Sequence, residues 1–305
     1  MKHLHLIVSL SQPPEAVLGE MPALRRLLAR AAQPADTDAA QAICTALGVT
    51  RQQDWPSAPL LARAEGLDAD SGYWLRADPV AYEIGMNGLL LRRPHPALDR
   101  EQAEALATAL GPDLGALGGQ LFVPDPQRWY LRLSAAPELT TQALETAMGR
   151  SVPPDWLAGR DSPAFLRLMN SVQMALHQHP LNSAREQAGA LPVNGLWLWG
   201  GGVSPSIGDP PDAIWGKGLL AQAMARATGI ESSPLPAAFS AAADGRVVAV
   251  PEMVDYGELD RAWFAPLASA LRWFRLGRLS VSLIGVQGRT FTLTAKDLWS
   301  WQRSA

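Results

Sequence analysis

The residues most able to do chemistry lie close together, between positions 177 and 202. His177 and His179 stand two apart, just before Pro180, and imidazoles are common metal ligands. Histidines at that spacing do not share a helical face, and no third ligand is evident. We therefore favour a role at the end of the preceding helix, where a cation suits the helix dipole, over a metal pair or a phosphate contact.

A second candidate is an anion site around Arg185. A guanidinium binds a carboxylate or phosphate through paired hydrogen bonds, and Asn182 and Asn194 could orient it. The simpler alternative is a structural network that fixes a strand at 191–199 to the loop before it. If this region binds a ligand, its contacts are Arg185, Asn182, Asn194 and His179.

The same segment ends in a run of three glycines, Gly200, Gly201 and Gly202, followed by Val-Ser-Pro-Ser. Backbone amides of such a run could cradle a phosphate, so these glycines join the ligand-binding candidates. The run lacks the Lys-Ser/Thr of a P-loop and the dinucleotide fingerprint. A turn where the chain leaves a sheet is the interpretation we favour.

Hydroxyl and carboxylate groups elsewhere give weaker signals, and no catalytic residue is assigned. Thr37 and Ser57 are candidate nucleophiles, but a hydroxyl without a metal or a neighbouring base is a poor one. Capping of a helix by Thr37 is the favoured role. Glu252, Asp255 and Glu258 form an acidic cluster that could hold a weak cation, although a solvated loop is favoured.

Composition excludes several classes of protein. The 305 residues carry a net charge of −3, whereas a general nucleic-acid binder is strongly basic. No segment approaches the ~20 apolar residues of a membrane span, and the first ten residues favour a buried strand over a signal peptide. Cys44 is the single cysteine, which excludes an internal disulfide and a cysteine-based metal site. We expect a cytoplasmic protein with no nucleic-acid or membrane partner.

The elements that must position these residues alternate between strand and helix. Apolar spacing predicts a first strand at 4–10, with His3 and His5 spaced so that both point to one face. Helices are predicted at 21–32 and 36–48, with Asp36 or Thr37 as the cap of the second. Residues 51–72 are expected to be mostly loop, and 73–134 a β-rich unit with one helix. Further elements are predicted at 162–177, 191–199, 216–228, 246–250, 258–274, 279–284 and 290–294, the last two as the strands of a hairpin around Gln287-Gly288. Such alternation predicts an α/β sheet with crossover helices.

Three stretches resemble the archaeal-type, cofactor-independent phosphoglycerate mutases. The most specific runs from His179-Pro-Leu-Asn through Arg185 and Pro-Val-Asn to Trp199-Gly-Gly-Gly. It is similar to the His-Pro-Val-Asn…Arg…Gly…Pro-Ala-Asn…Trp…Gly segment of those enzymes. Met21-Pro-Ala-Leu-Arg-Arg-Leu resembles their first helix, and Tyr73-Trp-Leu-Arg-Ala-Asp-Pro-Val stands where their inserted domain begins. Among these relatives the chain looks most like a proteobacterial branch, the RpfE-type regulatory proteins, which have no established activity.

The resemblance implies an alkaline-phosphatase-like α/β fold. Its core, formed by 1–72 and 135–305, would be a mostly parallel sheet with helices on both faces. Residues 73–134 would form an inserted α+β subdomain. A ligand pocket is then expected between insert and core, lined by Arg185, Asn182 and the three glycines.

Active members of this family hold two divalent metals with Asp and His ligands and use a Ser or Thr nucleophile. This chain departs from that pattern. Leu10-Ser-Gln-Pro-Pro stands where Asp-Gly is expected, and Gly285-Val-Gln-Gly stands where an Asp-His pair is expected. The loop after position 250 offers Glu252 and Asp255 but no histidine. We therefore expect no metal and no cofactor.

These observations favour a catalytically degenerate relative, a bacterial pseudoenzyme with a regulatory or binding role. One alternative is an active metal-dependent mutase or phosphatase with relocated ligands, and another is a sensor of a small phosphorylated metabolite. The partner would be a phosphorylated small molecule or a protein. Most of the 11 tryptophans are expected in the core, but Trp299 and Trp301 could mark a partner surface.

Overall fold

The computed structural model describes residues 2–31, 33–85, 88–240, 245–252 and 255–299. The chain divides into two compact units. We call Met1–Val49 with Ile207–Ala305 the core unit, and Thr50–Ser206 the inserted unit, and describe each by itself. Among the described helices, none has the length and apolar character that crossing a bilayer requires.

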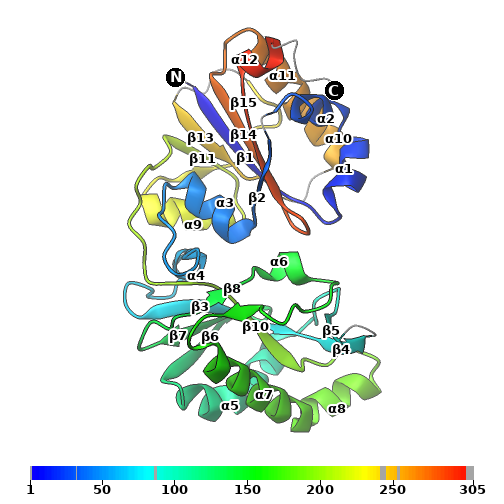
Figure 1. Cartoon of the computed structure of the whole chain (residues 1–305), viewed down its shortest axis with the longest axis vertical. Coiled ribbons are helices and arrows are strands. Elements are labelled where there is room, and N and C mark those ends of the chain that lie inside the picture. The colour runs from blue at the N-terminus through cyan, green and yellow to red at the C-terminus, as the bar shows by residue number, and fades with distance from the viewer. Residues whose placement is uncertain (1, 32, 86–87, 241–244, 253–254, 300–305) are drawn as a thin grey trace. The chain divides into compact units, whose positions relative to one another are not determined.

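The sheet of the core unit is mostly parallel (Figure 1). Its described strands, in spatial order, are β12 (Ser232–Ser233), β11 (Ala213–Trp215), β13 (Arg246–Ala249), β1 (His3–Ser9), β14 (Arg278–Ile284), β15 (Arg289–Thr294) and β2 (Ala35–Asp36). The pairings from β12 to β14 are parallel, whereas β15 runs antiparallel to β14 and β2. The predicted α/β class and the predicted closing hairpin, β14–β15, are confirmed.

Helices cover both faces of this sheet, as predicted. The described helices are α1 (Pro14–Glu20), α2 (Pro22–Leu28), α3 (Ala39–Ala46), α9 (Leu219–Thr228), α10 (Tyr256–Leu259), the π-helical turn η1 (Asp260–Phe264), α11 (Ala265–Arg272) and α12 (Ala295–Trp299). Leu4, Leu6 and Val8 of β1 share a buried cluster with side chains of α1, α2, η1 and α11. On the other face α3 packs against β14 and α9 against β11 (Figure 1).

Alternation along β1 turns His3 and His5 to the face opposite Leu4 and Leu6. His5 Nε2 lies 2.8 Å from Ser282 Oγ, and His3 Nε2 lies 3.1 Å from Ser280 Oγ, both serines being on β14. Burial lowers the pKa of His5 to about 3 and that of His3 to about 4. Both imidazoles are therefore neutral in the folded protein and serve the packing of the sheet.

A buried carboxylate joins η1 to α2. Asp260 accepts hydrogen bonds from the backbone N–H groups of Ala23 and Leu24, each at 2.8 Å. Helix α2 has no side-chain cap of its own, because Met21 occupies the N-cap position. The first amides of a helix lack intrahelical partners, so this carboxylate from a distant element satisfies them.

The inserted unit is built on an antiparallel sheet, in the order β10-β3-β7-β6. Its described strands are β3 (Tyr73–Val80), β4 (Tyr82–Gly85), β5 (Gly88–Leu91), β6 (Gly119–Asp125), β7 (Arg128–Leu133), β8 (Thr140–Thr141), β9 (Leu157–Ala158) and β10 (Gly195–Gly202). Its described helices are α4 (Ser57–Ala64), α5 (Arg100–Gly115), α6 (Leu144–Ala147), α7 (Ser162–Gln178) and α8 (Pro180–Gln187). Side chains of α5 and α7 share a buried cluster with one face of this sheet.

The boundaries of the inserted unit differ from the predicted 73–134. The strand expected in the core at 191–199 is β10, which pairs with β3: Trp197 lies opposite Asp78 and Trp199 opposite Arg76. This pairing draws the segment before β10 into the inserted unit. Residues 51–72, expected to be mostly loop, contain α4, whose apolar side chains are buried.

Acid is expected to destabilise the core unit. Below pH 6.5 the unfolded chain protonates both histidines while the folded chain holds them neutral down to pH 3–4, so the free energy of unfolding falls as pH falls. At pH ~5 the loss from His5 should be about 2 kcal/mol, measured by urea denaturation at pH ~7 and ~5. His5→Gln should lose less over this interval. An equal loss in the variant would contradict the assignment.

Candidate functional site

A cavity of about 720 Å³ opens at the carboxyl ends of three neighbouring strands of the core unit. Its described lining comes from the end of β1 (Ser9, Leu10, Ser11), the segment after β13 (Val250, Pro251, Glu252), the start of α9 (Gly218, Leu219, Leu220) and α10 with its cap (Asp255, Tyr256). Ligands of open α/β sheets bind outside the carboxyl ends of the strands. The volume suits a small molecule.

Hydrogen bonds between distant segments fix the backbone that lines this cavity. The chain leaves β1 at Leu10, whose N–H donates to Ile284 O at 2.8 Å. The next residue, Ser11, donates from its N–H to the Tyr256 hydroxyl at 3.0 Å. Gly216, after β11, has φ +136°, and a Cβ there would lie 2.6 Å from Val250 O. Only glycine allows this close approach of the two strand ends.

Two carboxylates line the cavity, and each binds a backbone amide, one just before α9 and one in the first turn of α10. Glu252 Oε1 accepts from Lys217 N–H at 2.7 Å, directly before Gly218, the N-cap residue of α9. Asp255 Oδ1 accepts from Glu258 N–H at 2.8 Å and caps α10. No lysine or arginine side chain belongs to the described lining, so the cavity carries negative charge.

These residues do not fit the two-metal centre that the family implies. Two cations that activate a phosphoryl group need several converging carboxylate and imidazole ligands. Across the described ranges, no three side chains of His, Cys, Asp or Glu lie close enough together to hold a metal ion. The acidic cluster predicted from Glu252, Asp255 and Glu258 is divided between the starts of two helices.

Arg185 lies in the inserted unit and is a structural residue. Its side chain is 7% exposed and donates to Leu191 O at 3.0 Å, Ala97 O at 2.8 Å and Gln102 Oε1 at 2.6 Å. These acceptors take the Nε and both terminal nitrogens, so the guanidinium joins α8 to the segment before α5. The predicted anion site is corrected to the structural network that was its alternative.

The two asparagines of the motif have the same role. Asn182 donates to Leu176 O and Val193 O, both at 2.7 Å, and accepts from Val193 N–H at 2.9 Å. Asn194 exchanges two hydrogen bonds with the backbone of Tyr82. His179 accepts from Leu181 N–H through Nδ1 and caps α8. They hold α7, α8 and the start of β10 together.

The three glycines form close packing contacts inside β10 rather than a phosphate cradle. A Cβ on Gly200 would lie 2.4 Å from Ser57 Oγ, and one on Gly201 would lie 2.3 Å from the Tyr73 hydroxyl oxygen. A Cβ on Gly202 would lie 2.4 Å from Pro56. At about 3.3 Å per residue, this end of β10 is some 20 Å from Asn194. The predicted ligand residues therefore do not converge.

The other candidates also have structural positions. Asp38, not Asp36 or Thr37, caps α3 by accepting from Gln41 N–H at 2.8 Å. Thr37 is buried, and its N–H donates to Gly288 O. Ser57 is fully buried at the start of α4, so its hydroxyl is not accessible to a substrate as a nucleophile. His177 lies in the last turn of α7, where a cation suits the helix dipole.

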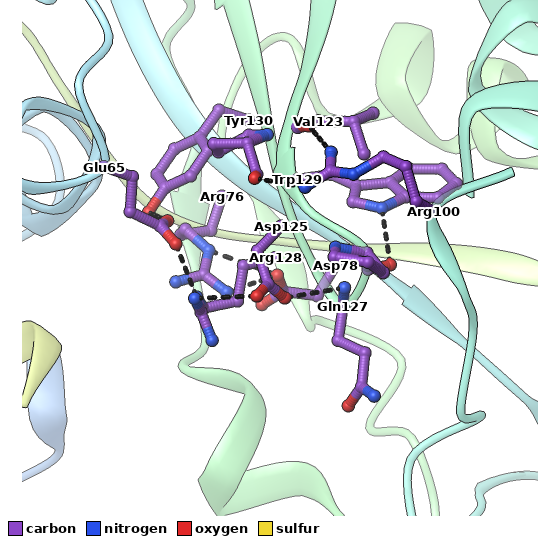
Figure 2. Close-up of polar contacts among 12 residues, drawn as sticks. Glu65, Arg76, Asp78, Arg100, Val123, Asp125, Gln127, Arg128, Trp129 and Tyr130 are labelled. Carbon is purple, nitrogen blue, oxygen red and sulfur yellow. Dashed lines mark hydrogen bonds and ion pairs between the residues drawn. The ribbon is translucent and has the colours of Figure 1, made fainter.

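A buried ionic cluster in the inserted unit escaped sequence analysis (Figure 2). Arg76 pairs with Asp78, with Nε 3.1 Å from Oδ1, and lies 5.0 Å from the ring centre of Tyr130 and 5.2 Å from that of Trp199. Burial disfavours the charged guanidinium, but the Asp78 carboxylate outweighs it and raises the pKa of Arg76. Every group has a partner inside the fold, so the cluster is structural. The sequence feature that could have indicated this cluster is the Arg-Ala-Asp alternation, which places both charges on one face of β3.

Ser9, Ser11 and Tyr256 of the cavity were not predicted from the sequence. The signal available for Ser9 was its place at the end of a predicted parallel strand. The contact between Ser11 and Tyr256 joins positions 245 residues apart, which no local pattern indicates.

The fold and this cavity define the chain as an α/β protein with a ligand-sized site at the carboxyl edge of a mostly parallel sheet. No protein-family model matches it. It is 27% identical over 148 residues to a probable 2,3-bisphosphoglycerate-independent phosphoglycerate mutase of Geobacter sulfurreducens, covering 46% of this chain and 37% of that one. It is 24% identical over 147 residues to the 2,3-bisphosphoglycerate-independent phosphoglycerate mutase of Methanosarcina mazei, covering 46% and 36%. The chain is thus a distant relative of these mutases, matched over less than half the length of each.

Two solved structures are also similar. The cofactor-independent phosphoglycerate mutase of Thermoplasma acidophilum has a TM-score of 0.40 at 17% identity, covering 96% of this chain and 90% of that one. The PH0037 protein of Pyrococcus horikoshii has a TM-score of 0.47 at 15% identity, covering 96% and 87%.

Replacing Arg185 should cost stability. Arg185→Ala removes the hydrogen bonds of a buried guanidinium to Leu191 O, Ala97 O and Gln102 Oε1, and we expect a loss of about 3 kcal/mol in the free energy of unfolding, measured with urea. Arg167→Ala is the matched control, since Arg167 lies exposed on the neighbouring helix α7. A stable Arg185→Ala protein with the same denaturation midpoint as the wild type would restore the anion-binding hypothesis.

Proposed function

We propose that this chain is a catalytically degenerate relative of the phosphoglycerate mutases, which binds a small molecule in the carboxyl-edge cavity without transforming it. The observation that carries the proposal is that both cavity carboxylates already accept a backbone N–H, Glu252 from Lys217 before α9 and Asp255 from Glu258 as the cap of α10. These carboxylates lie where a metal-dependent relative needs free ligands, and each is engaged by an amide. Membership of the RpfE-type proteins, a bacterial cytoplasmic setting and a regulatory output belong to this proposal.

The lining indicates which ligand chemistry fits. The hydroxyls of Ser9, Ser11 and Tyr256 can exchange hydrogen bonds with a polar ligand, and the leucines and Val250 supply apolar walls. The described lining holds two carboxylates and no lysine or arginine, which favours a neutral or positively charged molecule over a phosphorylated one. A hydroxylated amine, such as an amino sugar, combines these features.

An alternative function, as a sensor of a phosphorylated metabolite, is supported by one feature. Helix α9 begins at Gly218 without a side chain of its own to cap it, and helix starts attract anions. In the described structure Glu252 binds the amide just before this position. A phosphate would have to displace that carboxylate.

Measurement of bound metal tests whether the chain is catalytically degenerate. After purification with manganese and zinc present and extensive dialysis, we expect well below about 0.1 metal ion per chain, because the described residues do not bring together the ligand set that two-metal chemistry needs. Interconversion of 2- and 3-phosphoglycerate and hydrolysis of p-nitrophenyl phosphate should stay at background. Two equivalents of metal together with turnover would establish the alternative, an active enzyme with relocated ligands.

Ligand charge should control binding through Glu252. We expect glucosamine to raise the melting temperature of the wild type more than glucose 6-phosphate or 3-phosphoglycerate does, measured by differential scanning fluorimetry. Glu252→Gln keeps an acceptor for Lys217 N–H but removes the charge, so amine binding should weaken about five-fold and phosphate binding should strengthen.

Glu258→Gln is the matched control, because Glu258 lies in the same segment but outside the cavity lining. It should leave both responses unchanged. A larger response of the wild type to the phosphorylated compounds would reject the amine and support the metabolite sensor.

A further inference from the structure

A second cavity lies at the opposite, amino-terminal edge of the core sheet. It has a volume of about 800 Å³ and is lined by Lys2 before β1, by Phe274 and Arg275 between α11 and β14, and by Thr294 and Lys296 where β15 meets α12. It shares no residue with the carboxyl-edge cavity. The activity proposed above does not use it.

Three large aromatic side chains stand exposed beside this cavity. Trp273 is 64% exposed, Phe274 72% and Trp299 49%. Trp299 is held in place, since its Nε1 donates to Arg272 O at 3.3 Å and its ring centre lies 5.4 Å from the Arg272 guanidinium. Grouped apolar side chains at a surface mark interaction sites, and tryptophan is enriched where binding energy concentrates. Trp301, also predicted to mark a partner surface, lies outside the described residues.

Phe274 has a backbone conformation that favours glycine. Its φ is +57°, in the left-handed region, directly after the end of α11. Helices commonly end with a glycine in this conformation, because a Cβ is disfavoured there. The phenyl ring does not compensate by burial, since most of it faces solvent. A strained, exposed aromatic residue indicates a role outside the fold.

The described charged residues around these rings are mostly basic. The described basic residues are Lys2, Arg272, Arg275 and Lys296, and Arg275 and Lys296 are exposed. Among the described residues, Asp297 is an acid close to this group, and its carboxylate accepts from the N–H and hydroxyl of Thr294. This surface is therefore basic in a chain whose net charge is −3.

We propose that this basic aromatic surface, formed by Lys2, Arg272–Arg275, Lys296 and Trp299, binds an acidic segment of a partner protein that carries at least one large apolar side chain. The apolar side chain enters the cavity beside Phe274, and carboxylates of the segment pair with Arg275 and Lys296. Charge complementarity selects the partner and makes binding weaker as salt rises.

Selection from a random peptide library displayed on phage, with the intact chain as bait, tests this proposal. The enriched peptides should combine several Asp or Glu residues with a Trp, Phe or Leu. The most enriched peptide, synthesised with a fluorescein label, should bind at least about ten-fold more weakly at ~300 mM than at ~50 mM NaCl in fluorescence anisotropy.

Two variants separate binding from folding. Phe274→Gly removes the ring and relieves the left-handed strain, so it should weaken peptide binding at least ten-fold while leaving the melting temperature equal or higher. Arg275→Glu with Lys296→Glu should weaken binding similarly. Arg25→Glu with Arg26→Glu, on exposed residues of α2, changes the net charge equally and should leave binding intact.

Several outcomes would overturn the proposal. These are the absence of any enriched peptide, enrichment without an acidic bias, and equal binding of the peptide to Phe274→Gly and wild type. Binding of vesicles that contain about 30% phosphatidylserine, with no peptide binding, would identify a lipid surface instead. Concentration-dependent dimerisation that Phe274→Gly abolishes would identify a second copy of this chain as the occupant.

Discussion

The unpaired backbone amides at the start of a helix need acceptors, and carboxylates supply them at the positions that shape the core unit. Asp260 binds two amides of α2, Asp255 caps α10, and Glu252 binds the amide before α9. These three residues lie within nine positions of one another, directly after the strand that ends at the cavity. A carboxylate bound to helix amides is less available to a cation, because both compete for the same lone pairs. The described lining of the cavity is thus acidic, and its carboxylates are already bound to backbone amides.

The same need to pair buried polar groups explains the resemblance to the mutases. Asn182, Arg185 and Asn194, which carry the most specific motif, bind backbone groups of distant segments. Removing any one would leave backbone carbonyl or amide groups without these side-chain partners. Such residues serve the inserted unit whether or not the chain is an enzyme. A motif that holds a fold together thus shows descent without showing activity.

Sequence patterns predicted the core unit better than the inserted one, because local and distant interactions agree there. The apolar alternation of β1 and the turn at Gln287-Gly288 were sufficient to predict the parallel strand and the closing hairpin. The alternation around Trp197 equally predicted a strand but not its sheet, since its partner Asp78 lies far back in the chain. The cavity was only partly predictable for the same reason. Strand ends can be located from periodicity, whereas the pairing of Ser11 with Tyr256 requires the folded chain.

One helical stretch connects the surroundings of both sites. It begins at Tyr256, whose hydroxyl holds Ser11 in the acidic cavity, and ends at Arg272, next to the exposed rings of Trp273 and Phe274. Its middle is fixed from two sides: Asp260 binds the start of α2, and Trp263, fully buried, donates to Pro236 O at 3.2 Å. Transmission of a signal along such an element needs two discrete arrangements of its packed side chains. A stretch pinned by buried hydrogen bonds at its π-helical turn favours one arrangement, so the core unit is best understood as a rigid frame that presents a ligand cavity at one edge and a docking surface at the other.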